Sequence, residues 1–212
     1  GVISDFEVTE EMLAYLIAKV RMGTKSFIAP RVLIGVPSGI TSVEMRAARD
    51  AAQNAGARDV FLIEEPIVAA VGSKLPIHKA QGSMIIDIGG GTTDIAVISL
   101  NGIVTAKNLR IAGDQLNQDI MTYIRDQFKV LVGDKTAEDT KISLASVEEK
   151  SESKEIIVRG RDVVTGLPRE VVITDSDIRE AISGSINSIV EAARDVIENT
   201  PPEVLADIMQ RG

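Results

Sequence analysis

The residues best suited to chemistry lie in the run DIGGGTTD from Asp87 to Asp94, which apolar residues flank on both sides. A P-loop or a dinucleotide-binding turn leads from its glycines into a helix, whereas β-forming residues follow this run. The glycines are therefore predicted at the tip of a β-hairpin. Glycine adopts positive φ at little cost and has no side chain, so Gly89, Gly90 and Gly91 can present backbone N–H groups to an anion such as phosphate. The alternative is a turn with a purely structural role.

Three carboxylates lie where a phosphate site could use them. Asp87 comes at the end of the first predicted strand of the hairpin, where it could hold a cation or the water shell of a cation. Glu64 and Glu65 precede Pro66 at a predicted strand-to-helix junction, a place where side chains commonly face a ligand crevice. One of the two could orient a water for attack on a γ-phosphate. Alternatively, both are solvated acids that the helix dipole stabilises.

Two more pairs of residues have both a binding and a structural interpretation. Gly113 and Asp114 resemble a second turn that approaches a ligand closely, but Asp114 could equally cap the helix that follows. Glu138 and Lys141 are three residues apart on one predicted helical face. They could form an ordinary surface ion pair, or they could grip a sugar or a base.

The composition excludes several classes of site. The 212 residues contain no cysteine, which rules out disulfides and thiolate metal sites and fits a reducing compartment. A single histidine, His78, excludes most histidine-based zinc sites. A net charge of −8 argues against nucleic acid as a partner. No apolar run approaches the roughly 18 residues of a membrane span.

Helical and strand patterns alternate along the chain, which indicates an α/β protein. Capping residues are expected at Thr9, at Thr41 with Glu44, and at Asp175 or Ser176. Strands are expected at 31–37, 60–63, 83–88, 94–100, 103–107, 156–158 and 170–173. Helices are expected at 9–20, 41–53, 67–71, 115–129, 135–145, 175–198 and up to residue 211. The pattern changes near Gly82 to an antiparallel meander, which suggests two lobes with the glycine hairpin opening the second.

The run from Asp87 to Thr93 resembles the second phosphate-binding hairpin of the superfamily that includes actin, sugar kinases and DnaK-type chaperones. Within this superfamily, six other stretches resemble the MreB family of bacterial actin homologues that determine rod shape. They are GVPSGIT at 35–41, FLIEEP at 61–66, AVISL at 96–100, RIAGD at 110–114, VTGLP at 164–168 and TPPE at 200–203. The resemblance covers essentially the whole chain and implies an actin-like (ribonuclease H-like) two-lobe α/β fold.

The resemblance also implies roles for single residues. Glu65 matches the water-activating carboxylate of the family, with Glu64 as its neighbour. Asp87 matches the acid near Mg²⁺, which it would hold through water. The residues that match the family's ATP- or ADP-binding positions are Gly89, Gly90, Gly91, Thr92 and Thr93 around the phosphates, Gly113 and Asp114 in the connecting turn, and Glu138 and Lys141 at the adenosine.

Some of the superfamily's elements have no counterpart in this sequence. The first phosphate hairpin and the later glycine-rich adenosine segment are missing, so the fold is expected to be incomplete at both ends. The parent is expected to be a slow ATP hydrolase linked to polymerisation, and this piece alone is expected to be inactive. The resemblance implies lobe one at 1–82, the lobe-two core at 83–134, a small subdomain at 135–174, and a return to the core at 175–212. Asp94 stands where the family often has Glu.

A local basic patch suggests contact with a membrane. Residues 12–43 contain four basic side chains and no acid, and Phe27 and Ile28 lie among them in a predicted loop. An apolar pair ringed by basic groups can insert shallowly into an anionic leaflet, although a buried loop pair is the alternative. The MreB family is similar in using such a loop for membrane attachment.

The resemblance implies an ATP-dependent, membrane-associated cytoskeletal protein that polymerises and determines rod cell shape. Its implied partners are further copies of itself, the inner face of the cell membrane and the cell-wall elongation machinery, but not nucleic acid. The implied location is the cytoplasm, peripheral at the inner membrane face. The alternatives are another ATP-binding member of the fold, a DnaK-type chaperone or a sugar kinase, and a scaffold whose nucleotide site has decayed.

Overall fold

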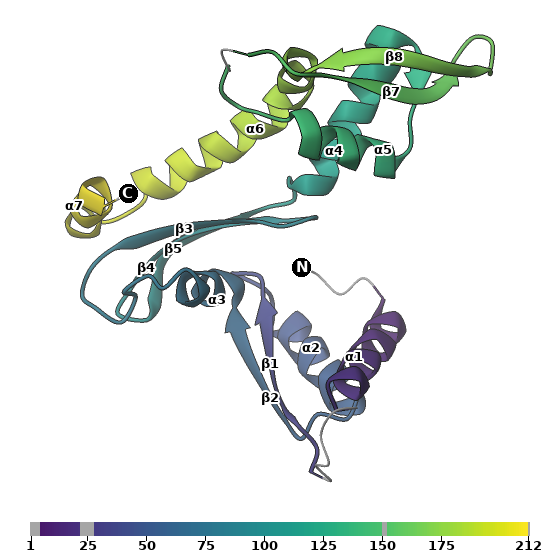
Figure 1. Ribbon diagram of the computed structural model, residues 1–212. Helices are drawn as coiled ribbons and strands as arrows, with labels where there is room; N and C mark the ends of the chain where they lie inside the picture. The colour runs from purple at the N-terminus through teal and green to yellow at the C-terminus, as the bar shows by residue number, and fades with distance from the viewer. Residues whose placement is uncertain (1–4, 22–27, 150–151, 212) are drawn as a thin grey trace. The chain divides into compact units, whose positions relative to one another are not determined.

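The structure is a computed structural model that describes residues 5–21, 28–149 and 152–211. The chain forms two compact units (Figure 1). The first unit consists of Gly1–Asp87, Asp94–Asn108 and Val196–Gly212, and the second of Ile88–Thr93 and Leu109–Asp195. The four-part division expected from the sequence stays a prediction.

The first unit begins with helix α1 (Phe6–Arg21), strand β1 (Arg31–Val36), helix α2 (Ser42–Asn54), strand β2 (Asp59–Glu64) and helix α3 (Glu65–Gly72). Strands β1 and β2 pair in parallel, as a βαβ crossover through α2 requires. The predicted capping box of Thr41 and Glu44 is confirmed at the start of α2. The cap predicted at Thr9 is wrong, because α1 begins earlier and the backbone N–H of Val8 donates to the carboxylate of Asp5 at 3.1 Å.

Three strands form the predicted meander: β3 (Ser83–Ile88), β4 (Thr93–Ser99) and β5 (Gly102–Leu109), in the sheet order β3-β4-β5. The central strand β4 is the most buried, as its continuous apolar sequence requires. Leu100 and Asn101 adopt φ of 51° and 61°, the conformation of a two-residue type I′ turn. The turn therefore lies one residue earlier than positions 101 and 102, which separate the two strands predicted at 94–100 and 103–107.

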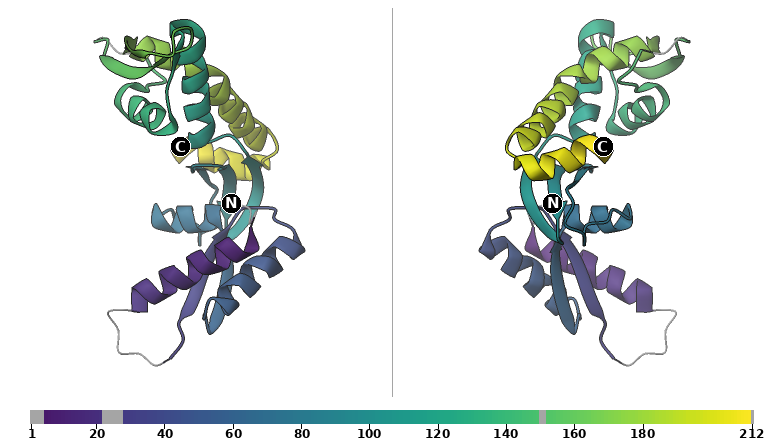
Figure 2. Two further views of the ribbon diagram at one scale, coloured as in Figure 1. Left: turned by 90° about the vertical axis from the view of Figure 1, so that its right-hand side faces the viewer. Right: turned by 90° about the vertical axis from the view of Figure 1, so that its left-hand side faces the viewer.

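The second unit contains α4 (Gly113–Tyr123), a π-helical turn (Ile124–Phe128), β6 (Val130–Leu131), α5 (Asp134–Leu144), β7 (Glu155–Asp162), β8 (Pro168–Thr174) and most of α6 (Asp175–Glu198). Strands β6, β7 and β8 form an antiparallel sheet, and Figures 1 and 2 show β7 and β8 as one hairpin next to α4 and α5. The last helix, α7 (Pro202–Arg211), belongs to the first unit.

The segment after α4 differs from the prediction. One helix through residue 129 was predicted, but the helix ends in the π-helical turn, and Lys129 reverses the chain with a left-handed φ of 57°. The short strand β6 that follows was not expected at all.

At the start of α6 the cap is Thr174, which exchanges hydrogen bonds with Asp177, so the cap predicted at Asp175 or Ser176 is wrong.

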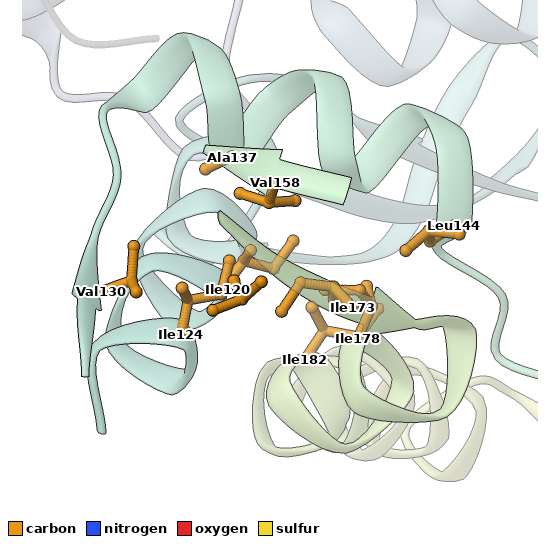
Figure 3. Close-up of a cluster of buried hydrophobic side chains, with 10 residues drawn as sticks. Ile120, Ile124, Val130, Ala137, Leu144, Val158, Ile173, Ile178 and Ile182 are labelled. Carbon is orange, nitrogen blue, oxygen red and sulfur yellow. The ribbon is translucent and has the colours of Figure 1, made fainter. Parts of the chain in front are cut away.

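Isoleucine and valine side chains from α4, β6, β7, β8 and α6 form the core of the second unit (Figure 3). Ile120, Ile124 and Ile173 are completely buried there. Ala137 and Leu144 attach α5 to the same core. This packing fixes the first turn of α4 and the exposed face of α5, which carry most of the candidate site.

Candidate functional site

The glycine run lies at the tip of the β3–β4 hairpin, as predicted. The tip is closed by a 2.9 Å hydrogen bond from the N–H of Gly89 to the carbonyl of Thr92. Within the described part of the chain, the backbone N–H groups of Gly90, Gly91 and Thr92 have no hydrogen-bond partner. Gly90 and Gly91 are also exposed. The tip therefore offers three neighbouring donors to an anion.

Positive φ, one of the two properties for which the sequence suggested glycine, is not used at the hairpin tip. None of Gly89, Gly90 and Gly91 has a left-handed φ. Instead, a Cβ at Gly90 would lie 3.6 Å from both carboxylate oxygens of Asp114, and a Cβ at Gly89 would lie 3.3 Å from the carbonyl of Thr92. Close approach therefore favours glycine at Gly89, whereas 3.6 Å at Gly90 is an ordinary van der Waals distance.

The first turn of α4 is docked directly on the hairpin tip. The N–H of Gly113 donates to the carbonyl of Gly89 at 3.0 Å, and that of Asp114 donates to the carbonyl of Gly90 at 2.8 Å. A Cβ at Gly113 would lie 3.3 Å from the carbonyl of Gly89, so Gly113 lies against the hairpin tip, and its close approach to a ligand stays a prediction. The alternative cap at Asp114 is not found, because α4 begins at Gly113 and has no side-chain cap.

The two threonines of the run lie in different surroundings. Thr92 is partly exposed at the tip, whereas Thr93 is completely buried. The hydroxyl of Thr93 donates to the carbonyl of Ile111 at 2.7 Å, which holds the hairpin against the segment that enters α4. The side chain of Thr93 therefore stabilises the tip from within and does not face a ligand.

Glu138 and Lys141 form the ion pair that their spacing suggested, with Nζ 2.7 Å from Oε2. The ammonium of Lys141 also donates to the carbonyl of Gly113 at 3.1 Å, so it links α5 to the first turn of α4. Asn117, which the sequence analysis missed, donates from Nδ2 to the same Oε2 of Glu138 at 2.8 Å. Its position one helical turn after Gly113 was the signal that could have pointed to it.

Among the carboxylates of the first unit, Glu65 lies at the start of α3, where Pro66 occupies the first turn as predicted. Its side chain crosses β1 at Gly35, where a Cβ would lie 3.2 Å from its Cγ. Burial raises the pKa of Glu65, and the negative charges of Asp94 and then Asp87 raise this pKa further. Glu64, in contrast, is exposed at the end of β2. The prediction that both acids are solvated therefore holds for Glu64 but not for Glu65, which is partly desolvated.

Asp94 is a buried carboxylate that the sequence analysis did not count as a site residue. It is only 2% exposed and accepts hydrogen bonds from the N–H and hydroxyl of Ser38 and from Nδ2 of Asn108. These bonds tie the loop after β1 to strands β4 and β5. Burying an ionised carboxylate requires such donors, and Asp94 has three.

The remaining predicted residues are less well defined by the geometry. Asp87 is partly buried near the end of β3. In the ranges 5–21, 28–149 and 152–211, no three acidic, histidine or cysteine side chains are arranged to hold a metal ion.

Of the two residues predicted to contact a membrane, Phe27 lies outside the described residues, and Ile28 is 64% exposed. No helix in the described part of the chain has the length and apolar character needed to cross a membrane.

Comparison with solved structures defines the class of protein. The chain superposes on the crystal structure of MreB5 of Spiroplasma citri bound to ADP with a TM-score of 0.93 and 37% identity, covering 100% of this chain and 63% of that one. A structure of the same protein bound to AMPPNP superposes with a TM-score of 0.91 and 36% sequence identity, with the same coverage of both chains. The MamK double helical filament gives a TM-score of 0.79 at 21% identity, over 98% of this chain and 62% of that one, which shows the fold alone. The fold is that of the actin-like proteins.

Comparison of sequences narrows this class to a family. The sequence model of the family described as MreB/Mbl protein matches residues 1–212. The chain is 50% identical to the cell shape-determining protein MreB of Haemophilus influenzae and 49% identical to the cell shape-determining protein Mbl of Bacillus cereus. Both matches cover 100% of this chain, which spans 61% and 63% of the length of these relatives. The chain belongs to the MreB/Mbl family, as the sequence motifs indicated.

Proposed function

We propose that this chain carries part of the ATP- and ADP-binding site of an actin-like, cell shape-determining protein that assembles into filaments. The observation that carries the proposal is the hairpin tip, with its three unpartnered backbone donors and the first turn of α4 docked against it. The MreB5 structures with ADP and AMPPNP, at 37% and 36% identity, support a nucleotide as the ligand. Membership of the MreB/Mbl family favours this function over a chaperone or a sugar kinase.

The phosphates of the nucleotide would accept hydrogen bonds from the N–H groups of Gly90, Gly91 and Thr92. The positive end of the α4 dipole adds to this attraction, since α4 begins within hydrogen-bond distance of the tip. Glu138 and Lys141 would hold the adenosine. The exposed side-chain fraction of 43% at Glu138, against 16% at Lys141, leaves the carboxylate accessible to ribose hydroxyls.

A magnesium ion fits the donor set if the phosphates share in binding it. Mg²⁺ in proteins commonly uses one or two carboxylates together with waters and substrate phosphates, and Asp87 offers one such carboxylate. When bound, the ion would neutralise negative charge on the phosphates. The carboxylate of Asp114, beside Gly90 and Gly91, would otherwise repel a phosphate, which is a further reason to expect a cation with the nucleotide.

Glu65 would orient the water that attacks the γ-phosphate, with Glu64 as its solvated neighbour. In its ionised form Glu65 accepts a hydrogen bond from water. Its raised pKa makes it a stronger base than an ordinary glutamate, because burial and the charges of Asp94 and Asp87 disfavour its carboxylate. Hydrolysis is expected to be slow and linked to assembly.

We also propose that the full-length protein attaches to the inner face of the cell membrane, in the cytoplasm, and works with the cell-wall elongation machinery. The 64% exposure of Ile28 among basic neighbours in the sequence supports shallow insertion. Two apolar residues anchor weakly, so attachment needs many subunits in one filament. Co-sedimentation of filaments with anionic liposomes tests this: Phe27→Ser with Ile28→Ser should lose binding, and unchanged binding would contradict the proposal.

The test of the nucleotide and filament proposal is sedimentation of the full-length protein with ATP, together with measurement of phosphate release. We expect wild type to pellet only with nucleotide. Glu65→Ala should still pellet but release phosphate about 100-fold more slowly, the lower range for loss of a positioned general base. Gln53→Ala, on the exposed side of α2, is the matched control and should behave as wild type. If wild type does not pellet with any nucleotide, the filament proposal is wrong.

A further inference from the structure

Asn117 lies on the side of α4 that faces α5, close to the end of the candidate site where the nucleoside would bind. It is 8% exposed, and its amide donates to Oε2 of Glu138 at 2.8 Å. The same oxygen accepts from Lys141 at 2.7 Å. Lys141 in turn donates to the carbonyl of Gly113. The four residues therefore form one chain of hydrogen bonds that runs from α4 to α5 and back.

In this series of hydrogen bonds the side chain of Glu138 is 43% exposed, against 16% for that of Lys141, and both Asn117 and Lys141 donate to it. The hydrogen bond from Lys141 lowers the pKa of Glu138, and the bond from Asn117 lowers it further, so the carboxylate stays ionised. Because both donors use Oε2, the other oxygen, Oε1, is left for donors from outside the protein. A carboxylate fixed in this way loses little rotamer freedom when a ligand binds.

Asn117 is an unusual residue to bury at this position. Among the residues that the structure describes, its Oδ1 has no hydrogen-bond partner, although the atom is shielded from solvent. An unsatisfied buried acceptor costs about 1–3 kcal/mol. Leu116, one residue before Asn117, and Ile120, three residues after it, are apolar and lie at the edge of the core and within it. The amide is therefore better explained by its bond to Glu138 than by packing.

We propose that Asn117 is a positioning residue for nucleoside binding, which acts by holding the Glu138 carboxylate toward the ribose hydroxyls. The inference rests on the proposed nucleotide site. It adds that Asn117 increases the affinity of this site for the nucleoside part of the ligand. The phosphate part binds at the hairpin tip, which Asn117 does not contact. Loss of Asn117 should therefore weaken nucleotide binding without weakening binding of a phosphate chain alone.

The test compares ADP with inorganic pyrophosphate as ligands of the full-length protein, by titration calorimetry. Asn117→Leu replaces the amide by an apolar side chain that branches at the same carbon and so removes the donor, and Asn117→Ala is the second variant. Both should bind ADP roughly tenfold more weakly, which corresponds to about 1.4 kcal/mol. Their affinity for pyrophosphate should stay within twofold of wild type. Gln118→Ala, at the exposed next position of α4, is the matched control and should change neither affinity.

A second measurement asks whether Asn117 acts through Glu138. In a Glu138→Ala background, Asn117→Leu should have no further effect on ADP affinity, because the carboxylate that it holds is gone. A full tenfold loss in that background would overturn the inference, as would an equal loss for ADP and pyrophosphate. A wild-type protein that binds pyrophosphate but not ADP would overturn the nucleoside role alone. Wild type that binds neither ligand would overturn the proposed nucleotide site itself.

Discussion

Replacing Gly113 by alanine tests whether ligand affinity depends on the close contact between Gly113 and the hairpin tip. The effect on affinity can be compared with the effect on the free energy of unfolding. The new methyl group would lie 3.3 Å from the carbonyl oxygen of Gly89 and 3.4 Å from Nζ of Lys141. The carbonyl belongs to the hairpin backbone and cannot move alone, because Gly113 itself donates to it at 3.0 Å. The hairpin tip and the first turn of α4 must therefore move apart by a few tenths of an ångström.

The change in unfolding free energy should be small because two effects oppose each other. Alanine reduces the entropy of the unfolded chain, which stabilises by about 0.4–1 kcal/mol. Overpacking costs typically about 1–3 kcal/mol. The net loss of unfolding free energy should be about 0–2.6 kcal/mol. The affinity for ADP, in contrast, should fall about tenfold or about 1.4 kcal/mol, since the displaced tip presents its donors in the wrong place.

Gly184→Ala is the matched control, because its Cβ would meet nothing within 4 Å in the middle of α6. This substitution should stabilise the protein by roughly 0.5–1 kcal/mol and leave the affinity for ADP unchanged. Denaturant unfolding and titration calorimetry on the full-length protein measure both quantities. Gly113→Ala with wild-type ADP affinity would refute the reasoning, because the docked turn would then have no part in binding.

Three other substitutions have defined outcomes. Gly160→Ala places a methyl group against the backbone of strand β6, so unfolding free energy should fall by about 3 kcal/mol in denaturant titrations. The backbone N–H of Thr165 and an arginine guanidinium lower the pKa of Asp162 to about 2, so its stabilisation is complete above pH 3.8 and lost toward pH 2. Wild type should therefore exceed Asp162→Asn in stability at pH 6 but not at pH 2. Asp94→Asn keeps an oxygen for the two donors of Ser38 but turns its NH2 group toward the donor Nδ2 of Asn108, and it should cost about 1–3 kcal/mol, measured in denaturant. It also removes a charge that raises the pKa of Glu65, so the acid limb of ATP hydrolysis should move to lower pH.

The sequence predicted those parts of the site that depend on local chain properties. A hairpin at the glycine run follows from the β-forming residues on both sides of it, and the capping box at Thr41 follows from spacing alone. The ion pair of Glu138 and Lys141 is likewise a consequence of helical periodicity. In each case the residues that interact are close together in the sequence.

The sequence could not predict contacts between distant segments. Asn117 holds Glu138 across 21 positions, and Ser38 holds Asp94 across 56. Neither pair has a local pattern that distinguishes it from ordinary surface residues. The π-helical turn after Tyr123 was missed for a related reason, since its end at Lys129 depends on the left-handed reversal into β6 and not on a glycine or proline.

The division of the chain into units has a consequence for how the protein can be dissected. The polypeptide passes from one unit to the other between residues 87 and 88, 93 and 94, 108 and 109, and 195 and 196. A single proteolytic cut or a simple truncation therefore cannot release either unit whole. Even the glycine hairpin is shared, with its tip in the second unit and its strands largely in the first. Producing the second unit by itself would require its two segments, Ile88–Thr93 and Leu109–Asp195, to be joined by a designed linker.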